Sequence, residues 1–507
     1  MKLSMRTLTI HYSTGRNKYR VPVKQLVVLA GACLALGLAG CKKYLETPPD
    51  NRTSLDTPDK VAQLLGTAYP QANYMAFAES ISDNVADKGV GGLDLTVLDP
   101  FMFQDVSDNQ QDSPEFYWNA CYSAIAAANQ ALKSSRSAAD TTKYKSEIGE
   151  ALVARAYAHF MLVTFFSKTY DAASAATDPG IPYVTEPENV VFKPYDRKTV
   201  AYVYQMIEQD LTQGLPLLDD KRYAVPRYHF TKVAAHAFAA RFYLFKKDYA
   251  GVVAHANQVL PSSVSDIPNS LRPWNTTYMT ITYVDLFARY EKASEPGNLL
   301  LVETSSLWGR NYFTQRYGMD ASKRSEILGN NVTRGEYAFG RQLYTVGTNN
   351  YLIPKINEYF VRQSVNATIG LPYVMVPILT MEEVLFNRVE ANIYLNNTTA
   401  ALADLNTYAS TRIYNYDPAK HTITSGSMAT YYGPNTLQGN LLNTWYDFKR
   451  AEFVQEGMRW FDLQRYKIPV THIKSDGTAL TLESTDLRRL FQLPESVATA
   501  GIPLNPR

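Results

Sequence analysis

TKVAAHAFAARFYLF, residues 231–245, is the most informative segment of the chain. Two apolar stripes run along it at helical spacing, one through Val233, Ala237, Ala240 and Leu244 and the other through Ala234, Phe238, Phe242 and Phe245. A helix that is apolar on so much of its circumference is covered on two sides, as in a stacked helical array. We expect residues 248–260 to return as its antiparallel partner after a short turn.

A short pattern, Ala-x-x-Tyr, recurs late in three predicted helices, at residues 154–157, 240–243 and 391–394. A hairpin is expected after the second and third copies, and in both it leads to an alanine seven residues beyond the tyrosine. The small residue lets two backbones approach closely while the tyrosine fills the groove beside it. This packing is typical of tetratricopeptide-like helical pairs. We therefore predict a mainly α fold, in which such pairs form a scaffold with long irregular loops and a few short strands.

The apolar periodicity divides the chain into parts. We expect an N-terminal helical part over residues 59–260, a loop-rich and ligand-facing region over 261–380, and a C-terminal helical part over 381–507. Further helices are predicted at 115–132, 144–166, 199–214, 381–395, 399–413, 441–456 (with Gly457 as a left-handed C-terminal cap) and 459–466. Long loops over a rigid scaffold commonly carry binding sites, so residues 261–380, together with 70–118, are the predicted ligand face.

The first 40 residues are typical of an export signal. A segment with six Lys and Arg and no acid precedes the uncharged run LVVLAGACLALGLAG at residues 26–40, which is too short for the ~20 residues of a spanning helix. Leu38-Ala-Gly-Cys41 resembles the bacterial lipobox, in which the cysteine is acylated and becomes the new N-terminus. We therefore expect a lipoprotein signal peptide over 1–40, lipidation at Cys41 and a tether over 41–58.

Charge and cysteine content exclude several classes of protein. The leader holds six of the 50 basic residues, so the rest of the chain has 44 basic and 48 acidic residues and a net charge of −4. No basic patch of the kind that nucleic acid demands is expected. Cys121 is the one thiol left after export and lipidation, which allows no internal disulfide, and it is predicted to be a core residue.

Motifs of catalysis and metal binding are absent from the sequence. None of the patterns H-E-x-x-H, G-x-S-x-G, G-x-x-x-x-G-K-[ST] or C-x-x-C occurs. His229, His236 and His255 are scattered, and each is better explained as a satisfied or surface imidazole than as a metal ligand. We predict no catalytic residue, no metal site and no cofactor, although carboxylate pairs are frequent enough that a glycosidase stays open as an alternative.

Residues 450–466, RAEFVQEGMRWFDLQRY, resemble the C-terminal signature of the SusD/RagB family, a run of the form ERR-x-E-x-x-x-EG-x-RWFDL-x-RW. The chain departs from that form at Phe448, where an acid is common, and at Tyr466, which replaces a tryptophan. Residues 150–157, 178–183, 231–260 and 491–494 are also similar to the family. The likeness covers essentially the whole mature chain, but the middle region shows no matching motif.

The resemblance implies a surface-exposed outer-membrane lipoprotein that binds a nutrient. Such proteins act as a lid on a SusC-like TonB-dependent transporter and deliver oligosaccharide or, in some members, peptide. Contact with the membrane is then expected through the lipid anchor alone. A tetratricopeptide-like adaptor that joins proteins at the outer membrane, without a small ligand, is the alternative from another class.

Candidate ligand contacts come from the irregular middle of the chain. A flat ring can cover the apolar face of a sugar while Asn, Asp or Arg binds its hydroxyls. The predicted ligand-binding residues are Trp274, Tyr278, Trp308, Tyr312, Asp83 and Asn84. By contrast, the signature residues are predicted to be structural, with Glu456 pairing with Arg459 three positions along a helix. These structural residues are Glu452, Glu456, Gly457, Arg459, Trp460, Phe461 and Asp462.

Overall fold

The computed structural model describes residues 54–188, 194–347, 349–362 and 364–507. The chain divides into two units, Met1–Ser54 and Leu55–Arg507, and all described helices and strands belong to the second. The predicted signal peptide, Cys41 and the tether as far as residue 53 lie outside the described residues.

Helices make up most of the N-terminal part of the described chain. They are α3 (Pro58–Leu65), α4 (Met75–Ser80), α5 (Leu95–Phe101), α6 (Pro114–Arg136), α7 (Lys145–Phe166), α8 (Val200–Gly214), α9 (Lys232–Lys246) and α10 (Tyr249–Ala256). The longer ones begin where the sequence offers a cap, since the side chains of Ser113, Thr199 and Thr231 each accept a hydrogen bond from the first turn. The predicted helices from α6 to α9 are confirmed to within four residues at each end, and α10 ends four residues early.

Helix α7 lies at the centre of this part and packs against α6 and α8. The segment Thr141–Phe166 is long and apolar enough by composition to cross a membrane, but 94% of its most apolar window is buried inside the fold. Its apolar character is therefore that of a core helix. Cys121 of α6 is fully buried, as predicted, and burial raises the pKa of its thiol.

The paired helices stack as the Ala-x-x-Tyr pattern predicts. Helix α9 packs against α10, α10 against α15, and α15 against α16. Ala154 of α7, Ala240 of α9 and Ala391 of α15 are all buried. The C-terminal part consists of α15 (Met381–Tyr394), α16 (Thr398–Arg412), α17 (Pro418–His421), α18 (Ser425–Tyr432), α19 (Leu437–Glu452), α20 (Arg459–Arg465) and α21 (Glu495–Thr499).

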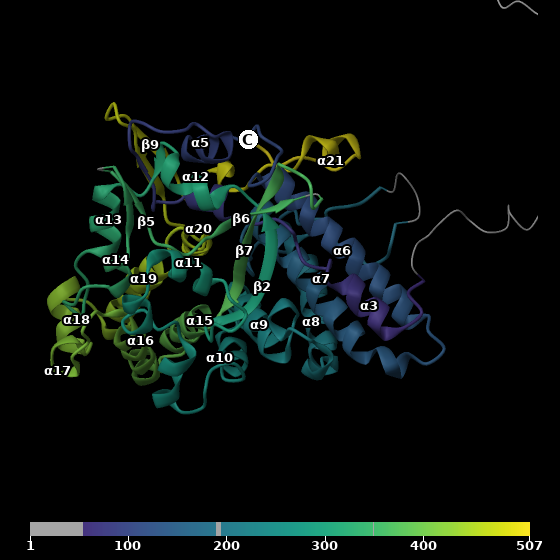
Figure 1. Cartoon of the computed structure of the whole chain (residues 1–507), viewed down its shortest axis with the longest axis horizontal. Coiled ribbons are helices and arrows are strands. Elements are labelled where there is room, and N and C mark those ends of the chain that lie inside the picture. The colour runs from purple at the N-terminus through teal and green to yellow at the C-terminus, as the bar shows by residue number, and fades with distance from the viewer. Residues whose placement is uncertain (1–53, 189–193, 348, 363) are drawn as a thin grey trace, which may run out of the picture. The chain divides into compact units, whose positions relative to one another are not determined.

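The middle region is more regular than the sequence predicts. Three antiparallel strands, β2 (Asn298–Ser305), β7 (Gly370–Thr380) and β6 (Glu358–Arg362), form a sheet in that order. In Figure 1 this sheet stands between α6, α7 and α8 on one side and α15, α16 and α19 on the other. The same region holds α11 (Tyr283–Tyr290), α12 (Trp308–Thr314), α13 (Ala321–Leu328) and α14 (Ala338–Arg341).

Three two-stranded sheets complete the described fold. They are β1 (Ala86–Asp87) with β3 (Tyr317–Gly318), β4 (Tyr344–Val346) with β5 (Asn350–Leu352), and β8 (Val470–Ile473) with β9 (Ala479–Leu482). The first of them joins the N-terminal part to the middle region. The prediction of a mainly α scaffold with few short strands is confirmed, apart from β7, which is longer than expected.

The turn between α19 and α20 departs from the prediction. Helix α19 ends at Glu452, four residues before its predicted end, and Gln455 and Gly457 both have positive φ, 78° and 71°. Glu456 therefore leaves the helix and does not pair with Arg459. Its carboxylate instead accepts hydrogen bonds from Lys355 Nζ at 2.8 Å and from the Tyr290 hydroxyl at 3.1 Å.

Candidate functional site

A cleft of about 570 Å³ opens between the first turns of α6, the end of β2 and the start of β7. Its walls combine aromatic rings, amides and hydroxyls. The lining residues are Thr67, Tyr69, Gln71, Gln111, Phe116, Asn119, Ala120, Ser123, Ala124, Ser305, Leu371 and Tyr373. Six of them lie in the two segments, 70–118 and 261–380, that were expected to face ligand, and the other six lie outside, at residues 67–69 and in α6 at residues 119–124.

Helix α6 supplies one wall of the cleft. The Ser113 side chain accepts a hydrogen bond from the Phe116 N–H at 3.1 Å, and Pro114 stands at the first helical position, so the helix begins at the edge of the cleft. Phe116, Asn119 and Ser123 then follow at helical spacing and share one face. That face presents a half-buried ring beside an exposed amide and an exposed hydroxyl.

The sheet supplies the opposite wall. Ser305 of β2 is paired with Tyr373 of β7, and Tyr373 is paired in turn with Tyr359 of β6. The two tyrosine rings lie 6.5 Å apart, nearly parallel. The Tyr359 hydroxyl donates a hydrogen bond to Glu303 Oε2 at 2.6 Å, which fixes that ring beside the cleft.

Hydrogen bonds between distant segments hold the two walls together. The buried Asp112 carboxylate accepts from the Ser306 hydroxyl at 2.5 Å and from the Leu307 N–H at 2.7 Å. Burial raises the pKa of Asp112 to about 7, although both hydrogen bonds act to lower it. The Ser305 N–H also donates to the Gln71 carbonyl at 3.2 Å. The start of α6 and the end of β2 therefore form one rigid frame.

The electrostatics of the cleft are neutral. None of its lining residues, all within the described chain, is Asp, Glu, Lys, Arg or His. Tyr69 also lines the cleft, and its hydroxyl makes two hydrogen bonds. It donates to Glu150 at 2.6 Å and accepts from the Phe230 N–H at 2.8 Å. Ring faces that cover C–H groups, beside amides and hydroxyls that exchange hydrogen bonds, suit an uncharged, hydroxyl-rich ligand.

The four aromatic residues predicted to contact ligand lie elsewhere. Trp274, Tyr278, Trp308 and Tyr312 are all fully buried. The Trp308 indole N–H donates to the Gln455 carbonyl at 2.9 Å, and the Trp274 ring packs edge-on against Phe339. A ring without accessible surface cannot stack on a ligand, so the prediction for these four residues is corrected: they are core residues.

Asp83 and Asn84 also have structural partners. The Asp83 carboxylate receives two hydrogen bonds from Arg459, from Nε at 2.7 Å and from Nη2 at 2.8 Å. Asn84 is fully buried between Glu79, to which its amide donates, and Arg450, from which it accepts. Both side chains fasten the segment after α4 to the C-terminal signature, and neither lines the cleft.

The signature residues are buried around this junction. Glu452 binds Arg412, with Nε at 2.7 Å, and Asp462 binds Lys449 at 2.7 Å. The Trp460 ring lies against Phe491, and the Phe461 ring lies against Tyr74, Phe165 and Phe245. The buried signature residues are Glu452, Glu456, Gly457, Arg459, Trp460, Phe461 and Asp462.

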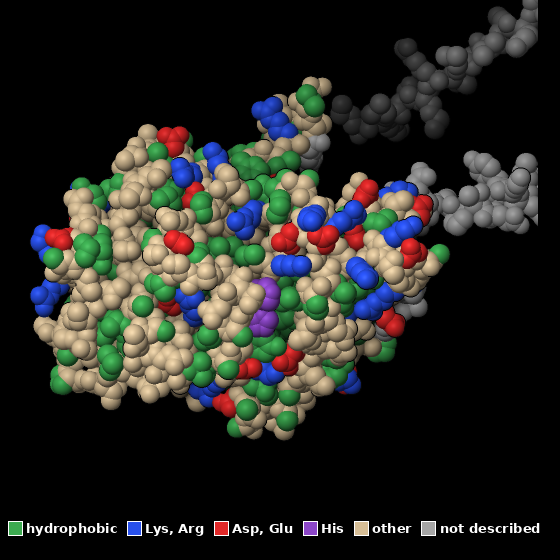
Figure 2. Space-filling model, turned by 90° about the horizontal axis from the view of Figure 1, so that it is seen from below, with side chains coloured by type: hydrophobic (Ala, Val, Ile, Leu, Met, Phe, Trp, Pro, Cys, Tyr) green, Lys and Arg blue, Asp and Glu red, His purple; other side chains and the backbone are tan. Residues whose placement is uncertain are grey.

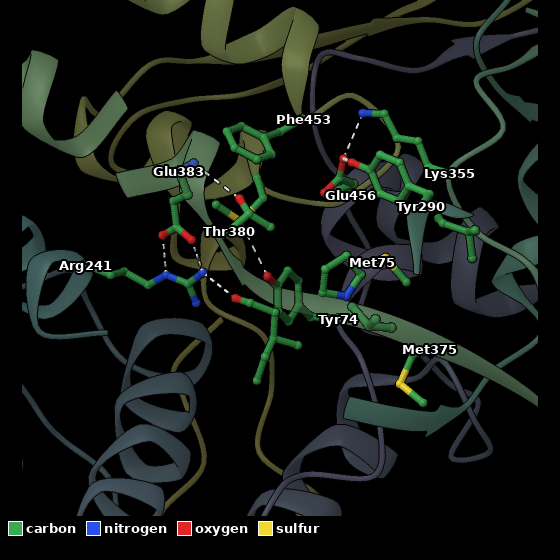
Figure 3. A pocket seen from close by; sticks show the side chains of 15 residues that line it. Tyr74, Met75, Arg241, Tyr290, Lys355, Met375, Thr380, Glu383, Phe453 and Glu456 are labelled. Atoms are coloured by element: carbon green, nitrogen blue, oxygen red, sulfur yellow. Dashed lines mark hydrogen bonds and ion pairs between the residues drawn. The ribbon is translucent and has the colours of Figure 1, made fainter. Parts of the chain in front are cut away.

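A second hollow, shown in Figure 3, lies beneath the sheet and is too small for a ligand. The space inside it that a water molecule can reach is about 20 Å³, which is room for about one water. Arg241 binds the Glu383 carboxylate at 2.5 Å and the Ile378 carbonyl at 2.7 Å, and Lys355 binds Glu456. Buried pairs with this many hydrogen bonds fix the geometry of a core.

Sequence reasoning missed the residues that line the cleft. Phe116 and Asn119 lie in a helix whose apolar pattern is the same as that of any other amphipathic helix. Tyr373 lies on a strand that was assigned to a loop. Phe116 and Tyr373 lie within the expected ligand face, whereas Asn119 lies just outside it.

Charged side chains on the surface do not form a large patch of one sign on the face that Figure 2 shows, where Lys, Arg, Asp and Glu are interspersed. Within the described residues no cluster of three or more His, Cys, Asp or Glu is arranged to hold a metal ion.

Comparison with known proteins gives a consistent result. Residues 43–244 match the SusD-like_3 family model, described as "Starch-binding associating with outer membrane". The fold also matches a SusD superfamily protein from Bacteroides thetaiotaomicron VPI-5482, with a TM-score of 0.64 and 18% identity over 89% of this chain and 100% of the other. The chain has a SusD-like fold.

Further solved structures share the SusD-like fold. A SusD-like carbohydrate binding protein from Bacteroides vulgatus ATCC 8482 matches with a TM-score of 0.62 and 14% identity, over 88% of this chain and 97% of the other. A laminarin binding SusD-like protein matches with a TM-score of 0.58 and 16% identity, over 88% and 97%. A comparison with curated proteins gives no significant match.

Proposed function

We propose that this SusD-like protein binds an uncharged oligosaccharide in the cleft between α6 and the sheet, and that it does so without catalysis. The observation that carries the proposal is the lining of the cleft, where Phe116 and Tyr373 offer ring faces and Gln71, Gln111 and Asn119 offer amides. Aromatic faces beside several hydrogen-bonding groups are the usual way to bind a sugar ring. The family description, which names starch, supports carbohydrate over peptide.

The volume of the cleft supports an oligosaccharide over a large polymer as the bound unit. Small-molecule sites commonly enclose ~300–1,000 Å³, and the cleft of about 570 Å³ lies within that range. Asn119 and Ser123 are exposed along the helix face, so a longer chain can continue beyond the cleft.

Isothermal titration calorimetry of the chain from residue 42 onward tests this proposal. Neutral glucans, including starch and laminarin oligosaccharides, are titrated beside acidic glycans and mixed peptides. Saturable binding of a neutral glycan that Phe116→Ala weakens about tenfold supports the proposal, since one stacked ring contributes ~1–2 kcal/mol. Binding of peptides alone, or glycan binding that Phe116→Ala and Tyr373→Ala leave unchanged, contradicts it. Release of shortened glycan in the same samples contradicts the non-catalytic part.

We further propose that the protein is anchored to the outer membrane by acylation of Cys41 and passes its ligand to a TonB-dependent transporter. The lipobox-like Leu38-Ala-Gly-Cys41 and the family's description as associating with the outer membrane support this placement. Metabolic labelling with an alkyne-bearing palmitate is expected to mark the wild-type chain and not Cys41→Ser. Equal labelling of both chains contradicts the anchor.

A further inference from the structure

A second cleft, of about 310 Å³, lies where the C-terminal segment crosses the end of α20. Its walls are the loop that follows α7, the residues that end α20, and residues 484–490. Unlike the cleft beside α6, it has no aromatic lining, and it carries charged groups and hydroxyls. It therefore calls for a ligand of different chemistry.

The three carboxylates of this cleft already have cationic partners. Asp178 binds Lys168 Nζ at 2.7 Å, and Asp171 lies 3.4 Å from Lys467 Nζ. Asp486 binds Arg488, whose Nη2 lies 2.6 Å from Oδ2. Both lysines that line the cleft are therefore already in ion pairs.

Arg489, the third cation of the cleft, forms no ion pair with a described carboxylate. It is 4% exposed, and no described carboxylate lies within 4.0 Å of it. Its guanidinium donates to the Leu463 carbonyl at 2.7 Å, the Ile468 carbonyl at 2.9 Å and the Gln464 side chain at 3.3 Å. These three acceptors are neutral, and a guanidinium has five N–H donors. Burial lowers the pKa of Arg489 to about 10, and the charge of Asp486, which acts to raise it, does not offset the effect of burial.

We propose that this cleft binds a small hydroxylated monocarboxylate, such as a uronic acid, whose carboxylate supplies the missing counter-charge to Arg489. Buried charges in proteins are normally paired, and a guanidinium matches the planar shape of a carboxylate. The hydroxyls of Thr169, Ser484 and Thr485 line the same cleft and suit a ligand rich in hydroxyl groups. The site is independent of the cleft beside α6.

The charge count favours a carboxylate over a phosphate. The lining holds three cations and three carboxylates, but Asp486 pairs with Arg488, which lies outside the lining, so the charge of Arg489 alone is left unbalanced. One carboxylate adds a single negative charge next to Arg489. A doubly charged phosphate adds two, close to Asp171, Asp178 and Asp486, and is disfavoured by their repulsion.

Calorimetric titration of the chain from residue 42 onward with glucuronate and galacturonate tests the proposal, with glucose and inorganic phosphate as comparison ligands. Two substitutions at the rim probe the cleft, Lys467→Glu by charge and Thr485→Trp by volume. Lys474→Glu, on the β8–β9 turn and outside the cleft, is the matched control. Both rim positions are exposed, so the variants are expected to fold, and a thermal melt checks this.

We expect saturable uronate binding, and we expect each rim variant to weaken it about tenfold. Lys474→Glu and Phe116→Ala are expected to leave uronate binding unchanged. Arg489→Met is expected to abolish uronate binding if the variant folds. If it does not fold, the two rim variants provide the test. Three outcomes overturn the proposal: no saturable uronate binding, glucose binding as tightly as uronate, or phosphate binding more tightly than uronate. Loss of glycan binding in Phe116→Ala with uronate binding intact separates this site from the proposed function.

Discussion

The backbone N–H of Gly457 donates a hydrogen bond of 3.0 Å to Oε2 of Glu79, although the two residues lie 378 positions apart in the chain. Oε1 of the same carboxylate accepts from the Gln455 N–H at 2.7 Å. Burial raises the pKa of Glu79 to about 7, against the lowering effect of these bonds. A single buried side chain of α4 thus fastens the turn between α19 and α20 to the N-terminal part of the fold.

Gly457→Ala is expected to lower the free energy of unfolding by about 2–4 kcal/mol. Two causes combine there: φ is 71°, and an added Cβ would lie 3.1 Å from the Ala78 Cβ and from the Met75 Cα. Gly477→Ala is the matched control, because Gly477 has φ of 83° but nothing within 4 Å of its added Cβ. The control is expected to cost about 1–2 kcal/mol, from backbone strain alone. Urea denaturation measures both, and equal losses contradict a packing role for Gly457.

Asp83→Ala is expected to destabilise the protein by about 3 kcal/mol, because it leaves the buried Arg459 without its counter-ion. Burial acts to raise the pKa of Asp83, but the charge of Arg459 outweighs it and holds the pKa below its ordinary value. Glu336→Ala breaks the exposed pair between Glu336 and Arg341 and is expected to cost far less stability, because an exposed ion pair is screened by solvent. If the two variants unfold at the same urea concentration, the Asp83–Arg459 pair does not join the two ends of the fold.

Asp112→Asn is expected to flatten the dependence of stability on pH. The pKa of Asp112 is raised to about 7 in the folded protein, so the folded state holds this proton more tightly than the unfolded state. The unfolding free energy of the wild type therefore falls by roughly 3 kcal/mol from this group as the pH rises from about 4 to about 7. The asparagine Oδ1 can still accept from the Leu307 N–H, and its amide can donate to the Ser306 hydroxyl in place of accepting from it. Asparagine also tolerates the φ of 69° at this position.

Chemical denaturation at several pH values measures the effect of Asp112→Asn. The variant is expected to lose less stability between pH 4 and pH 7 than the wild type, while Asp266→Asn, at an exposed position, keeps the wild-type profile. Parallel profiles for all three proteins contradict the raised pKa.

Trp308→Ala and Phe116→Ala are expected to separate folding from binding. Trp308 is fully buried, so its removal is expected to lower the unfolding free energy by about 3–5 kcal/mol. Phe116 is half-buried at the cleft, so its removal is expected to cost much less stability but to weaken glycan binding about tenfold. Thermal melts and calorimetry on both variants measure this. A Trp308→Ala protein that is stable but unable to bind glycan restores the original prediction for the middle tryptophans.

Local patterns predicted the helical scaffold well. The apolar patterns of residues 115–132 and 231–245 are properties of adjacent residues, so the sequence alone locates α6 and α9. The turn after α19 could be predicted only in part. The left-handed conformation of Gly457 was predicted, but the early end of α19 and the positive φ of Gln455 were not. Glu79, which accepts hydrogen bonds from the N–H groups of Gln455 and Gly457, lies far away in the sequence.

Non-local packing explains the errors at the candidate site. Strands β2 and β7 pair across a gap of about 65 residues, and neither strand shows the pairing in its own composition. The burial of Trp274 and Trp308 follows from that sheet and from the helices around it. The cleft exists because Ser305 and Tyr373 stand opposite the face of α6 that carries Phe116, a relationship that only the folded chain reveals.

The most direct test of the proposed function is a crystal structure of the protein with a neutral oligosaccharide that calorimetry has shown to bind. The account predicts a sugar ring stacked on Phe116 or Tyr373, with hydroxyls hydrogen-bonded to Gln71, Gln111 or Asn119. Sugar density at any other place on the molecule, with the cleft beside α6 left open, would contradict it.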